Sequence, residues 1–358
     1  MGKGRNFYMA KPLLTIGLIV KDEIRCIERC LKALQPLREA IPCEVIIADT
    51  GSKDGTRAVA EQYADLVFDF PWVNDFAAAR NAVMDRSSGS WYLSLDADET
   101  LDPDVAELKT FLTDSRVNDC TSAYLLINNY VDPSDDSQYT VFEAHRLLNM
   151  STGLRFQGRV HEVWPGAALS RYTYLRKTIL WHDGYIYNGV LTSAEKGKRN
   201  MALIEQQLAE HPNNLLYLMQ AVESSYTTEQ SLRYVRRMMD QLKKDGVEGN
   251  ILGAAAYRNA LRIGGEAGMP EYQEWLEEAL AAYPQSPYIQ VDANYMAVMT
   301  AQKAHEYDKV LTYGQSYLEG MERLKQGDFG PGGLRCGTIA AGSKGNYEGV
   351  VLAMAMAH

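Results

Sequence analysis

Short apolar segments alternate with helical patterns along the first third of the chain, and this alternation restricts the fold more than any other feature. Strand-like segments cover residues 13–20, 43–49, 66–70 and 90–95. Between them, apolar residues recur at helical spacing, and capping residues such as Asp54 and Thr56 stand where a helix would start. Strands that alternate with helices in this way form βαβ units. The sequence therefore predicts an open, mainly parallel sheet with right-handed crossovers.

The pattern changes after this region. β-rich segments follow one another at residues 123–131, 139–148, 156–164 and 172–181, without long helices between them. This succession predicts a mixed or antiparallel extension of the same sheet. The first domain is therefore expected to cover residues 11–190.

Helical patterns dominate the rest of the chain. They cover residues 194–210, 214–225, 228–244, 251–263, 272–283, 287–301 and 307–324. Pro212 and Pro284 stand in the same register of two similar segments, separated by about two units of a ~34-residue helical-hairpin repeat. We expect an all-α helical-repeat domain over residues 191–325, although helices packed as a lid or a dimer surface would show the same pattern. Residues 326–358 are glycine-rich and aperiodic, and we interpret them as a tail in loop conformation.

Composition excludes several classes of protein. A net charge of −10 argues against a protein that binds the nucleic-acid backbone. Five cysteines in a chain of this length do not form a disulfide framework, and the Cys26 and Cys30 pair is better explained by core packing than by a metal. No apolar run approaches the ~20 residues that span a bilayer. The first ten residues lack the apolar core of a signal peptide, so we expect a cytoplasmic protein without a membrane span.

Acidic residues follow the ends of three predicted strands. The apolar run that starts at Trp91 leads directly into Asp96 and Asp98, and Asp22 with Glu23, as well as Asp49, hold similar positions. Carboxylates at the carboxyl edge of a sheet suit Mg²⁺ or Mn²⁺, and this edge is where open α/β sheets bind ligands. One pocket could then hold a base, a ribose and a metal-bound diphosphate. Each acid taken alone could equally be a helix cap or a solvated turn residue.

Four blocks of this region resemble family 2 glycosyltransferases in both order and spacing. They are residues 16–23, 46–56, 74–81 and 94–99, and the resemblance extends over about residues 12–190. It implies a GT-A fold, an α/β nucleotide-sugar-binding domain with a mixed, mainly parallel sheet. The chain is most similar to the bacterial branch that appends a tetratricopeptide-like helical domain, which includes peptide and flagellar-type protein glycosyltransferases.

The resemblance also implies roles for single residues in the donor site. Asp49 would contact the base or ribose, with Lys21 and Glu23 lining the same pocket. Asp96 would hold the ribose or a metal-bound water, and Asp98 would ligate the metal. Arg80 would face the diphosphate, unless its helix orients it for packing instead. The family block more often has asparagine at the position of Asp22.

Two further motifs complete the expected site. Residues 155–162 are similar to the His-Glu block of this branch, and transfer with inversion needs a base, for which Glu162 is the candidate. An ion pair between Glu162 and a nearby arginine, such as Arg159, is the structural alternative, and His161 would orient or pack. His182 would be a third metal ligand, which suits Mn²⁺ better than Mg²⁺, or a buried core histidine. The basic side chains at residues 196–199 either form a solvated helix face or bind the diphosphate.

These features predict a metal-dependent inverting glycosyltransferase that uses Mn²⁺ or Mg²⁺. It would move a sugar from a UDP- or GDP-type donor to a hydroxyl or thiol, expected on a peptide or protein. The helical domain would recognise that acceptor or pair two subunits in a homodimer. A glycan or lipid-linked acceptor stays open, as does a non-catalytic helical-repeat scaffold with a degenerate transferase domain. A nucleotidyltransferase is disfavoured because no glycine-rich loop follows the first strand.

Overall fold

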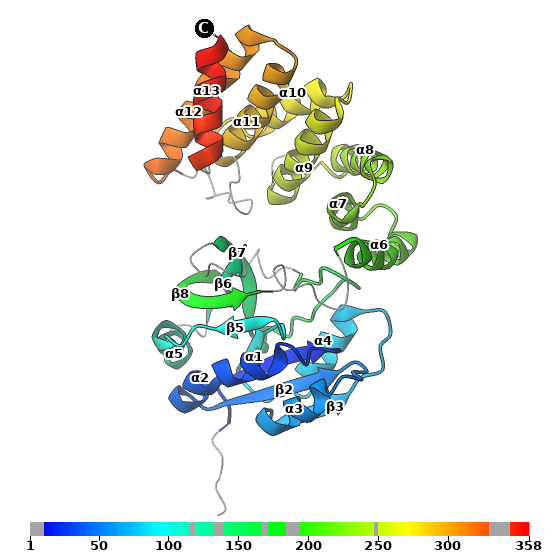
Figure 1. Ribbon diagram of the computed structural model, residues 1–358, viewed down its shortest axis with the longest axis vertical. Helices are drawn as coiled ribbons and strands as arrows, with labels where there is room; N and C mark the ends of the chain where they lie inside the picture. The colour runs from blue at the N-terminus through cyan, green and yellow to red at the C-terminus, as the bar shows by residue number, and fades with distance from the viewer. Residues whose placement is uncertain are drawn as a thin grey trace, which may run out of the picture. The chain divides into compact units, whose positions relative to one another are not determined.

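The computed structural model describes residues 11–114, 119–131, 139–165, 171–183, 193–246, 250–328 and 344–357. The chain divides into two compact units, Met1–Thr192 and Ser193–His358. The first unit contains a mixed β-sheet with helices, and the second is helical throughout its described residues (Figure 1). The predicted fold class, an α/β domain followed by an all-α one, is therefore confirmed.

The described strands of the first unit form one sheet in the order β3-β2-β1-β4-β7-β6-β8-β5. Their bounds are β1 Leu14–Val20, β2 Cys43–Asp49, β3 Leu66–Asp69, β4 Trp91–Ser94, β5 Glu99–Leu101, β6 Ser122–Tyr130, β7 Tyr139–Asn149 and β8 Tyr172–His182. β1 lies parallel to both β2 and β4, and β2 is parallel to β3. Antiparallel pairing begins at β7, which joins β4 to β6, and β5 closes the sheet against β8. The sheet is thus mixed, as predicted.

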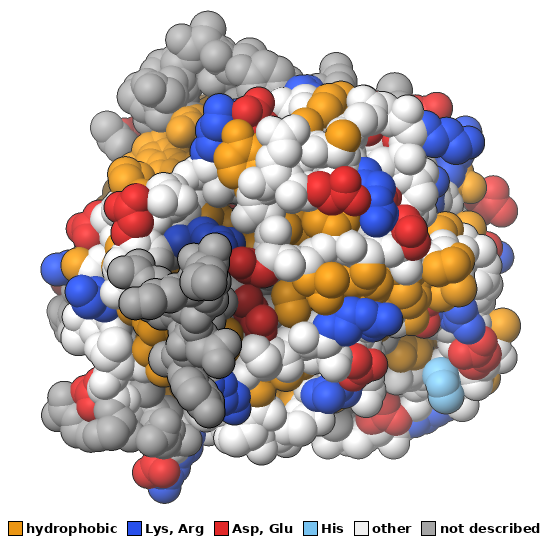
Figure 2. Space-filling model, turned by 90° about the horizontal axis from the view of Figure 1, so that it is seen from below, with side chains coloured by type: hydrophobic (Ala, Val, Ile, Leu, Met, Phe, Trp, Pro, Cys, Tyr) orange, Lys and Arg blue, Asp and Glu red, His pale blue; other side chains and the backbone are white. Residues whose placement is uncertain are grey.

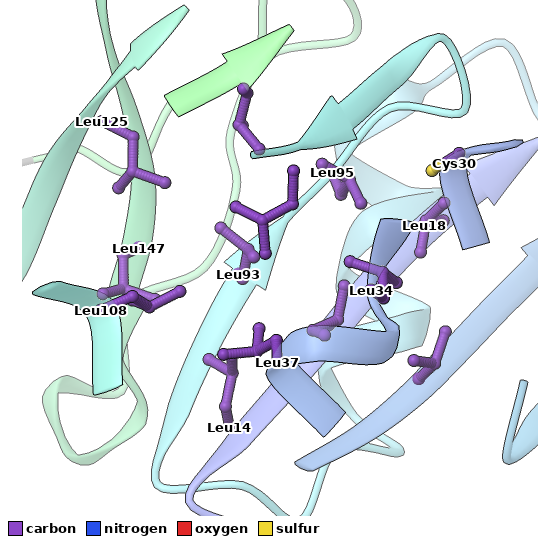
Figure 3. Close-up of a cluster of buried hydrophobic side chains, with 14 of the residues drawn as sticks. Leu14, Leu18, Cys30, Leu34, Leu37, Leu93, Leu95, Leu108, Leu125 and Leu147 are labelled. Carbon is purple, nitrogen blue, oxygen red and sulfur yellow. The ribbon is translucent and has the colours of Figure 1, made fainter. Parts of the chain in front are cut away.

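Helices cover both faces of the parallel half of the sheet. They are α1 Ile27–Ala33, α2 Gln35–Ala40, α3 Thr56–Tyr63, α4 Phe76–Met84 and α5 Ala106–Thr113. One apolar cluster joins β1 and β4 to α1, α2 and α5, and Figure 3 shows Leu14 and Leu93 of this cluster facing Leu37. A second cluster places α4 on the opposite face, where Val83 and Met84 pack near Tyr92. β1 is buried on both faces, which explains its continuous apolar sequence.

Gly17, in the middle of β1, makes room for a large residue of the neighbouring strand. A Cβ atom at this position would lie 2.1 Å from the hydroxyl oxygen of Tyr92. Tyr92 is fully buried, so its ring has no space into which it could retreat. The glycine in the first sequence block therefore serves packing between β1 and β4.

One predicted strand is a turn in the structure. Residues 156–164 were expected to be extended, but only Gln157 and Val163 form a β-bridge. Gly158 and His161 have φ values of 102° and 51°, and this left-handed backbone folds the segment back on itself. The buried Phe156 and Trp164 anchor the turn in the second apolar cluster. The segment has apolar residues at both ends because both ends of the turn are buried. In the sequence, these apolar residues give the pattern that predicted a strand.

The second unit is built from helices that pack against their neighbours in sequence. Their bounds are α6 Ser193–Glu210, α7 Leu215–Ser224, α8 Thr228–Asp245, α9 Ile251–Ala267, α10 Tyr272–Ala282, α11 Pro287–Lys303, α12 Tyr307–Lys325 and α13 Lys344–Ala357. Contacts also join α7 to α9, α9 to α11 and α11 to α13, which is the pattern of a helical array. Pro212 follows α6 and Pro284 follows α10, so both prolines lie in the link of a helical hairpin, as the repeat predicts.

The prediction of a loop over residues 326–358 is wrong for residues 344–357. Residues 344–357 form α13, whose Val350 and Ala353 are buried in a cluster with α11 and α12. Gly345 and Gly349 lower the helix propensity of this segment, so its sequence predicts a loop. Packing of the apolar face overrides that propensity. Residues 329–343 lie outside the described part of the chain, as do residues 184–192.

Charged side chains of both signs are interspersed on the face shown in Figure 2. Several form exposed ion pairs in the first unit, among them Arg38 with Asp65 and Arg57 with Asp69. Within the described residues, no helix combines the length and the hydrophobicity required to cross a bilayer.

Candidate functional site

The carboxyl ends of β1, β2 and β4 meet at one edge of the sheet, and the predicted acids lie there. Val20 pairs with Asp49 at the ends of β1 and β2. Asp49 is buried, and its Oδ1 accepts hydrogen bonds from the backbone N–H groups of Gly51 and Ser52 at 2.9 and 2.8 Å. One carboxylate oxygen therefore shapes the turn that follows β2.

The loop after β1 is bonded to that same turn. Asp22 Oδ1 accepts from Lys53 N at 2.7 Å, and the N–H of Asp22 donates to Ser52 Oγ at 3.0 Å. Asp22 has a φ of 55°, a left-handed conformation that aspartate and asparagine adopt more readily than other non-glycine residues. This explains why asparagine and aspartate both suit the position. Lys21 is exposed beside it, and Glu23 Oε2 accepts from Cys26 Sγ at 3.3 Å.

Arg80 is the centre of an ionic network at the end of β4. It lies on α4, which begins where Asp75 Oδ1 accepts from Ala78 N. Each guanidinium nitrogen contacts a different side chain: Nη2 donates to Asp96 Oδ1 at 2.6 Å, Nη1 to Ser94 Oγ at 3.0 Å and Nε to Glu162 Oε1 at 2.5 Å. Only 6% of Arg80 is exposed. The structure thus places Arg80 between two carboxylates, and not in an open position facing a diphosphate.

Glu162 reaches this network because the turn at residues 157–163 is attached to α4. Asn81 donates from Nδ2 to the carbonyl oxygen of Phe156 at 3.0 Å, and its Oδ1 accepts from Phe156 N at 2.9 Å. The N–H of Phe76 donates to the carbonyl oxygen of Arg159 at 2.9 Å. Glu162 does form an ion pair with an arginine, as the structural alternative expected, but the partner is Arg80 and not Arg159.

Sequence reasoning missed the second arginine of the network. Arg146, on β7, donates from Nη2 to Asp96 Oδ2 at 3.1 Å and also to Glu99 Oε1. Glu99 is 1% exposed, and its Oε2 accepts from Asp96 N at 3.0 Å. Glu99 belongs to the sequence block at residues 94–99. Nothing in the spacing of residues 139–149, by contrast, marks Arg146 as a residue of the site.

Charge and burial oppose each other in this network. Burial alone would raise the pKa of Asp96, but the guanidinium groups of Arg80 and Arg146 hold it well below its usual range. Burial raises the pKa of Glu99 to about 7, and the nearby Asp96 adds to this effect while Arg146 opposes it. The two guanidinium groups therefore favour the ionised form of Asp96 and hold it from both sides.

Asp98 and His182 form a second centre beside the first. β5 pairs with β8 so that Glu99 lies opposite His182, and His182 Nε2 is 3.3 Å from Asp98 Oδ2. On the other side of the ring, Nδ1 lies 2.6 Å from Oδ1 of Asn129, on β6. An amide oxygen only accepts, so Nδ1 carries a proton in this contact. Burial lowers the pKa of His182, but hydrogen bonding to Asp98 and the charges of Asp98, Glu99 and Asp96 outweigh it and raise the pKa.

This pair fits a divalent cation that also binds substrate. Within the described residues, no group of three His, Cys, Asp or Glu side chains could hold a metal ion. Mg²⁺ and Mn²⁺ commonly take few protein ligands and keep positions for waters and phosphates. A carboxylate beside an imidazole whose other nitrogen is already held has the donor set and the supporting contact that such a site needs.

Basic side chains of α1 and its preceding turn approach the end of β8. Arg29 Nη2 lies 2.5 Å and Arg25 Nη1 3.7 Å from Oδ2 of the buried Asp183. The N–H of Asp183 donates to the carbonyl oxygen of Asp98 at 3.4 Å, which connects this ion pair to the second centre. The basic run at residues 196–199 lies on α6 in the second unit, where Lys198 and Arg199 are exposed.

Two solved structures that match this chain have low sequence identity to it and TM-scores below 0.4. TarS of S. aureus, residues 1–349, is 11% identical with a TM-score of 0.37, over 88% of this chain and 91% of that one. The mannosyltransferase PcManGT of Pyrobaculum calidifontis, solved with GDP-Man and Mn²⁺, is 13% identical with a TM-score of 0.38. That match covers 76% of this chain and 87% of the mannosyltransferase.

Sequence relatives extend across both units. A TPR repeat-containing protein of Synechococcus elongatus is 28% identical over 286 residues, which cover 76% of this chain and 68% of the relative. The SPbeta prophage-derived glycosyltransferase SunS of Bacillus subtilis is 23% identical over 245 residues, or 65% of this chain and 54% of SunS. The matched region thus spans about two thirds of the first relative and about half of the second. Residues 15–178 match the model of Glycosyl transferase family 2.

Proposed function

We propose that this chain, whose residues 15–178 match the model of Glycosyl transferase family 2, is a glycosyltransferase that transfers a sugar, with inversion, from a nucleoside-diphosphate donor. The donor is of the UDP or GDP type. Its base and ribose bind at the ends of β1 and β2, where Lys21, Glu23 and Asp49 follow or end these strands. The shared edge of these parallel strands supports this placement, because open α/β sheets bind their ligands there.

Asp96 is the fixed hydrogen-bond acceptor of the donor site. Two guanidinium groups favour its ionised form and orient it, so a hydroxyl of the donor ribose meets a carboxylate that is already in position. Asp98 and His182 hold the divalent cation. An imidazole ligand favours Mn²⁺ over Mg²⁺. When bound, the cation stabilises the negative charge that develops on the departing diphosphate.

Glu162 is the base of the reaction. Its carboxylate takes the proton of the acceptor hydroxyl or thiol while the acceptor atom forms a bond to the anomeric carbon. The bond from that carbon to the diphosphate oxygen breaks at the same time, and the electron pair leaves with the diphosphate. Attack from the face opposite the leaving group inverts the anomeric centre. The side chain of Glu162 is partly exposed, as a group that meets an acceptor must be.

The helical unit recognises the acceptor, which we place on a peptide or protein. Helical arrays usually bind extended partners along a groove, and a relative that covers both units is a TPR repeat-containing protein. A pocket of about 440 Å³, lined by residues such as Tyr226, Thr227 and Arg262, opens among α7, α8 and α9. Pairing of two subunits through this unit is the alternative use of the same helices.

One observation carries the proposal: the Asp98–His182 pair stands next to a carboxylate network that includes Glu162. The test is release of nucleoside diphosphate from UDP-glucose, UDP-N-acetylglucosamine and GDP-mannose, with and without MnCl₂. We expect Mn²⁺-dependent release from at least one donor, and that donor's nucleotide should raise the melting temperature. A protein that neither binds nor cleaves any nucleotide sugar would be a scaffold with a degenerate transferase domain.

A further inference from the structure

We propose that Arg80 is a positioning residue, which fixes the carboxylate of Glu162 in place by bridging it to Asp96. The inference rests on the proposed role of Glu162 as the base. It assigns Arg80 an action on the acceptor side of the reaction, where the resemblance had implied a contact with the donor diphosphate.

The geometry of the guanidinium makes the bridge possible. Nε contacts Glu162, Nη2 contacts Asp96 and Nη1 contacts Ser94, so three directions of one rigid plane are used. A lysine has a single charged nitrogen on a flexible stem and would not span both carboxylates with defined angles. The bridge therefore depends on the shape of the arginine side chain as well as on its charge.

Other contacts hold Arg80 itself in one orientation. Its guanidinium carbon lies 5.7 Å from the centroid of the Phe156 ring, and the side chain is almost completely buried. Asp96, the far end of the bridge, is fixed from the other side by Arg146. Glu162 is thus connected through Arg80 to a carboxylate that two guanidinium groups hold.

The backbone around Glu162 makes such a support necessary. Between Gln157 and Val163, the residues form a turn with left-handed backbone at Gly158 and His161, closed by the two hydrogen bonds of one β-bridge. A base carried on a turn has more freedom than one carried on a helix or strand. Because a base misplaced by about 1 Å can cost on the order of 100-fold in rate, the contact with Arg80 bears on kcat.

Arg146 provides the matched control. It holds Asp96, like Arg80, but the structure places it on Asp96 and Glu99 and not on Glu162. R146K therefore removes no direct contact of Glu162, while R80K disturbs the direct contacts with both Asp96 and Glu162. The experiment uses the full chain with MnCl₂ and whichever of UDP-glucose, UDP-N-acetylglucosamine and GDP-mannose the wild type cleaves, at saturating donor. Affinity for the corresponding diphosphate is measured separately by calorimetry.

We expect R80K to lower kcat at least about 10-fold more than R146K does, with similar changes in diphosphate affinity. The double variant R80K/E162Q should be slower than E162Q alone by no more than the factor by which R146K slows the wild type, because the part of the R80K loss that acts through Glu162 is already absent. Equal losses of kcat in R80K and R146K, or multiplicative losses in the double variant, would overturn the inference.

A second variant keeps Arg80 intact and covers the case in which R80K does not fold. E162D retains the charge but withdraws the carboxylate from Nε of Arg80, and kcat should fall about as far as in R80K. Full activity of E162D would show that catalysis does not depend on where Arg80 places the carboxylate of residue 162, and it would overturn the inference. Full activity of E162Q has another meaning, since it would remove the base from the proposed function itself.

Discussion

His182 Nε2 lies 3.3 Å from Asp98 Oδ2, and the antiparallel pairing of β8 with β5 produces this proximity. β5 follows the acidic motif directly, whereas β8 is the last strand of the sheet in sequence. The two residues meet because the short strand β5, which follows the motif, pairs antiparallel with β8, and β8 itself runs parallel to β6. The metal site that we propose is therefore a product of topology and not of sequence proximity.

Asn129 should control the affinity of this site for metal. Its Oδ1 holds Nδ1 of His182, and loss of such a supporting contact typically costs 10–100-fold in metal affinity. N129A should raise the MnCl₂ concentration for half-maximal nucleotide-sugar cleavage by about that factor. Asn128, the preceding residue of β6, points to the opposite face of the sheet. N128A should leave the MnCl₂ requirement near that of the wild type, and equal shifts in both variants would contradict the role of Asn129.

Removal of the carboxylate charge at Glu162 should separate chemistry from binding. E162Q keeps the size of the side chain and can still contact Arg80, but it cannot accept a proton. General-base catalysis contributes about 10²–10⁴-fold, so kcat should fall by that factor while the affinity for nucleoside diphosphate stays within about twofold. Calorimetry and a cleavage assay on one preparation measure both quantities. Loss of diphosphate binding together with activity would indicate that Glu162 serves the structure of the site.

Asp292, in the helical unit, should make stability depend on pH. It is buried on α11, and burial raises its pKa to about 6 although Arg258 opposes the shift. Between pH 4 and 6, the folded unit therefore retains a proton that the unfolded chain has already lost, and stability falls as the pH rises. One pKa unit corresponds to about 1.4 kcal/mol, so the rise of the Asp292 pKa from 3.8 to about 6 predicts that D292N gains about 3 kcal/mol at pH 7 relative to the wild type.

Urea unfolding at pH 4, 5, 6 and 7 tests this expectation. The midpoint of the wild-type helical unit should decrease across this window, whereas that of D292N should change much less. A D292N midpoint that follows the wild type at every pH would assign the dependence to other groups.

Gly17 should tolerate no side chain. A Cβ atom would overlap the Tyr92 ring, and overpacking of a core typically costs about 1–3 kcal/mol. G17A should therefore lower the melting temperature of the first unit. Gly349, on α13, has open space around its Cβ position, so G349A should be neutral or should stabilise the helical unit by up to about 1 kcal/mol. Thermal denaturation of both variants is sufficient, and a G17A variant as stable as the wild type would contradict the packing of β1 on β4.

The donor half of the site could be predicted from the sequence because its geometry is local. β1, β2 and β4 are neighbouring parallel strands. Residues at or just after their carboxyl ends, such as Asp49 and Asp96, therefore share one edge of the sheet, independently of how the rest of the chain folds. The left-handed conformation of Asp22 agrees with the preference for asparagine at that position. In each case, a residue type and its place at the end of a strand were enough.

The supporting residues could not be predicted because their positions depend on non-local register. Arg146 and Asn129 lie on strands β7 and β6, whose pairings contain irregularities at Ala123/Tyr124 and Leu125/Leu126. A shift of one residue moves a side chain to the other face of a sheet, so no reading of residues 122–149 alone identifies which of them face Asp96 or His182. The turn that carries Glu162 could not be predicted either, because the apolar residues at its two buried ends give the sequence pattern of a strand.

The central claim is that Asp98 and His182 hold the cation that anchors the donor diphosphate. Electron paramagnetic resonance of free Mn²⁺, titrated with protein in the presence of UDP or GDP, measures this directly. The wild type should bind one equivalent of Mn²⁺, D98A should bind none at the same concentrations, and D85A, at an exposed position after α4, should bind like the wild type. Undiminished binding of Mn²⁺ by D98A would contradict the account.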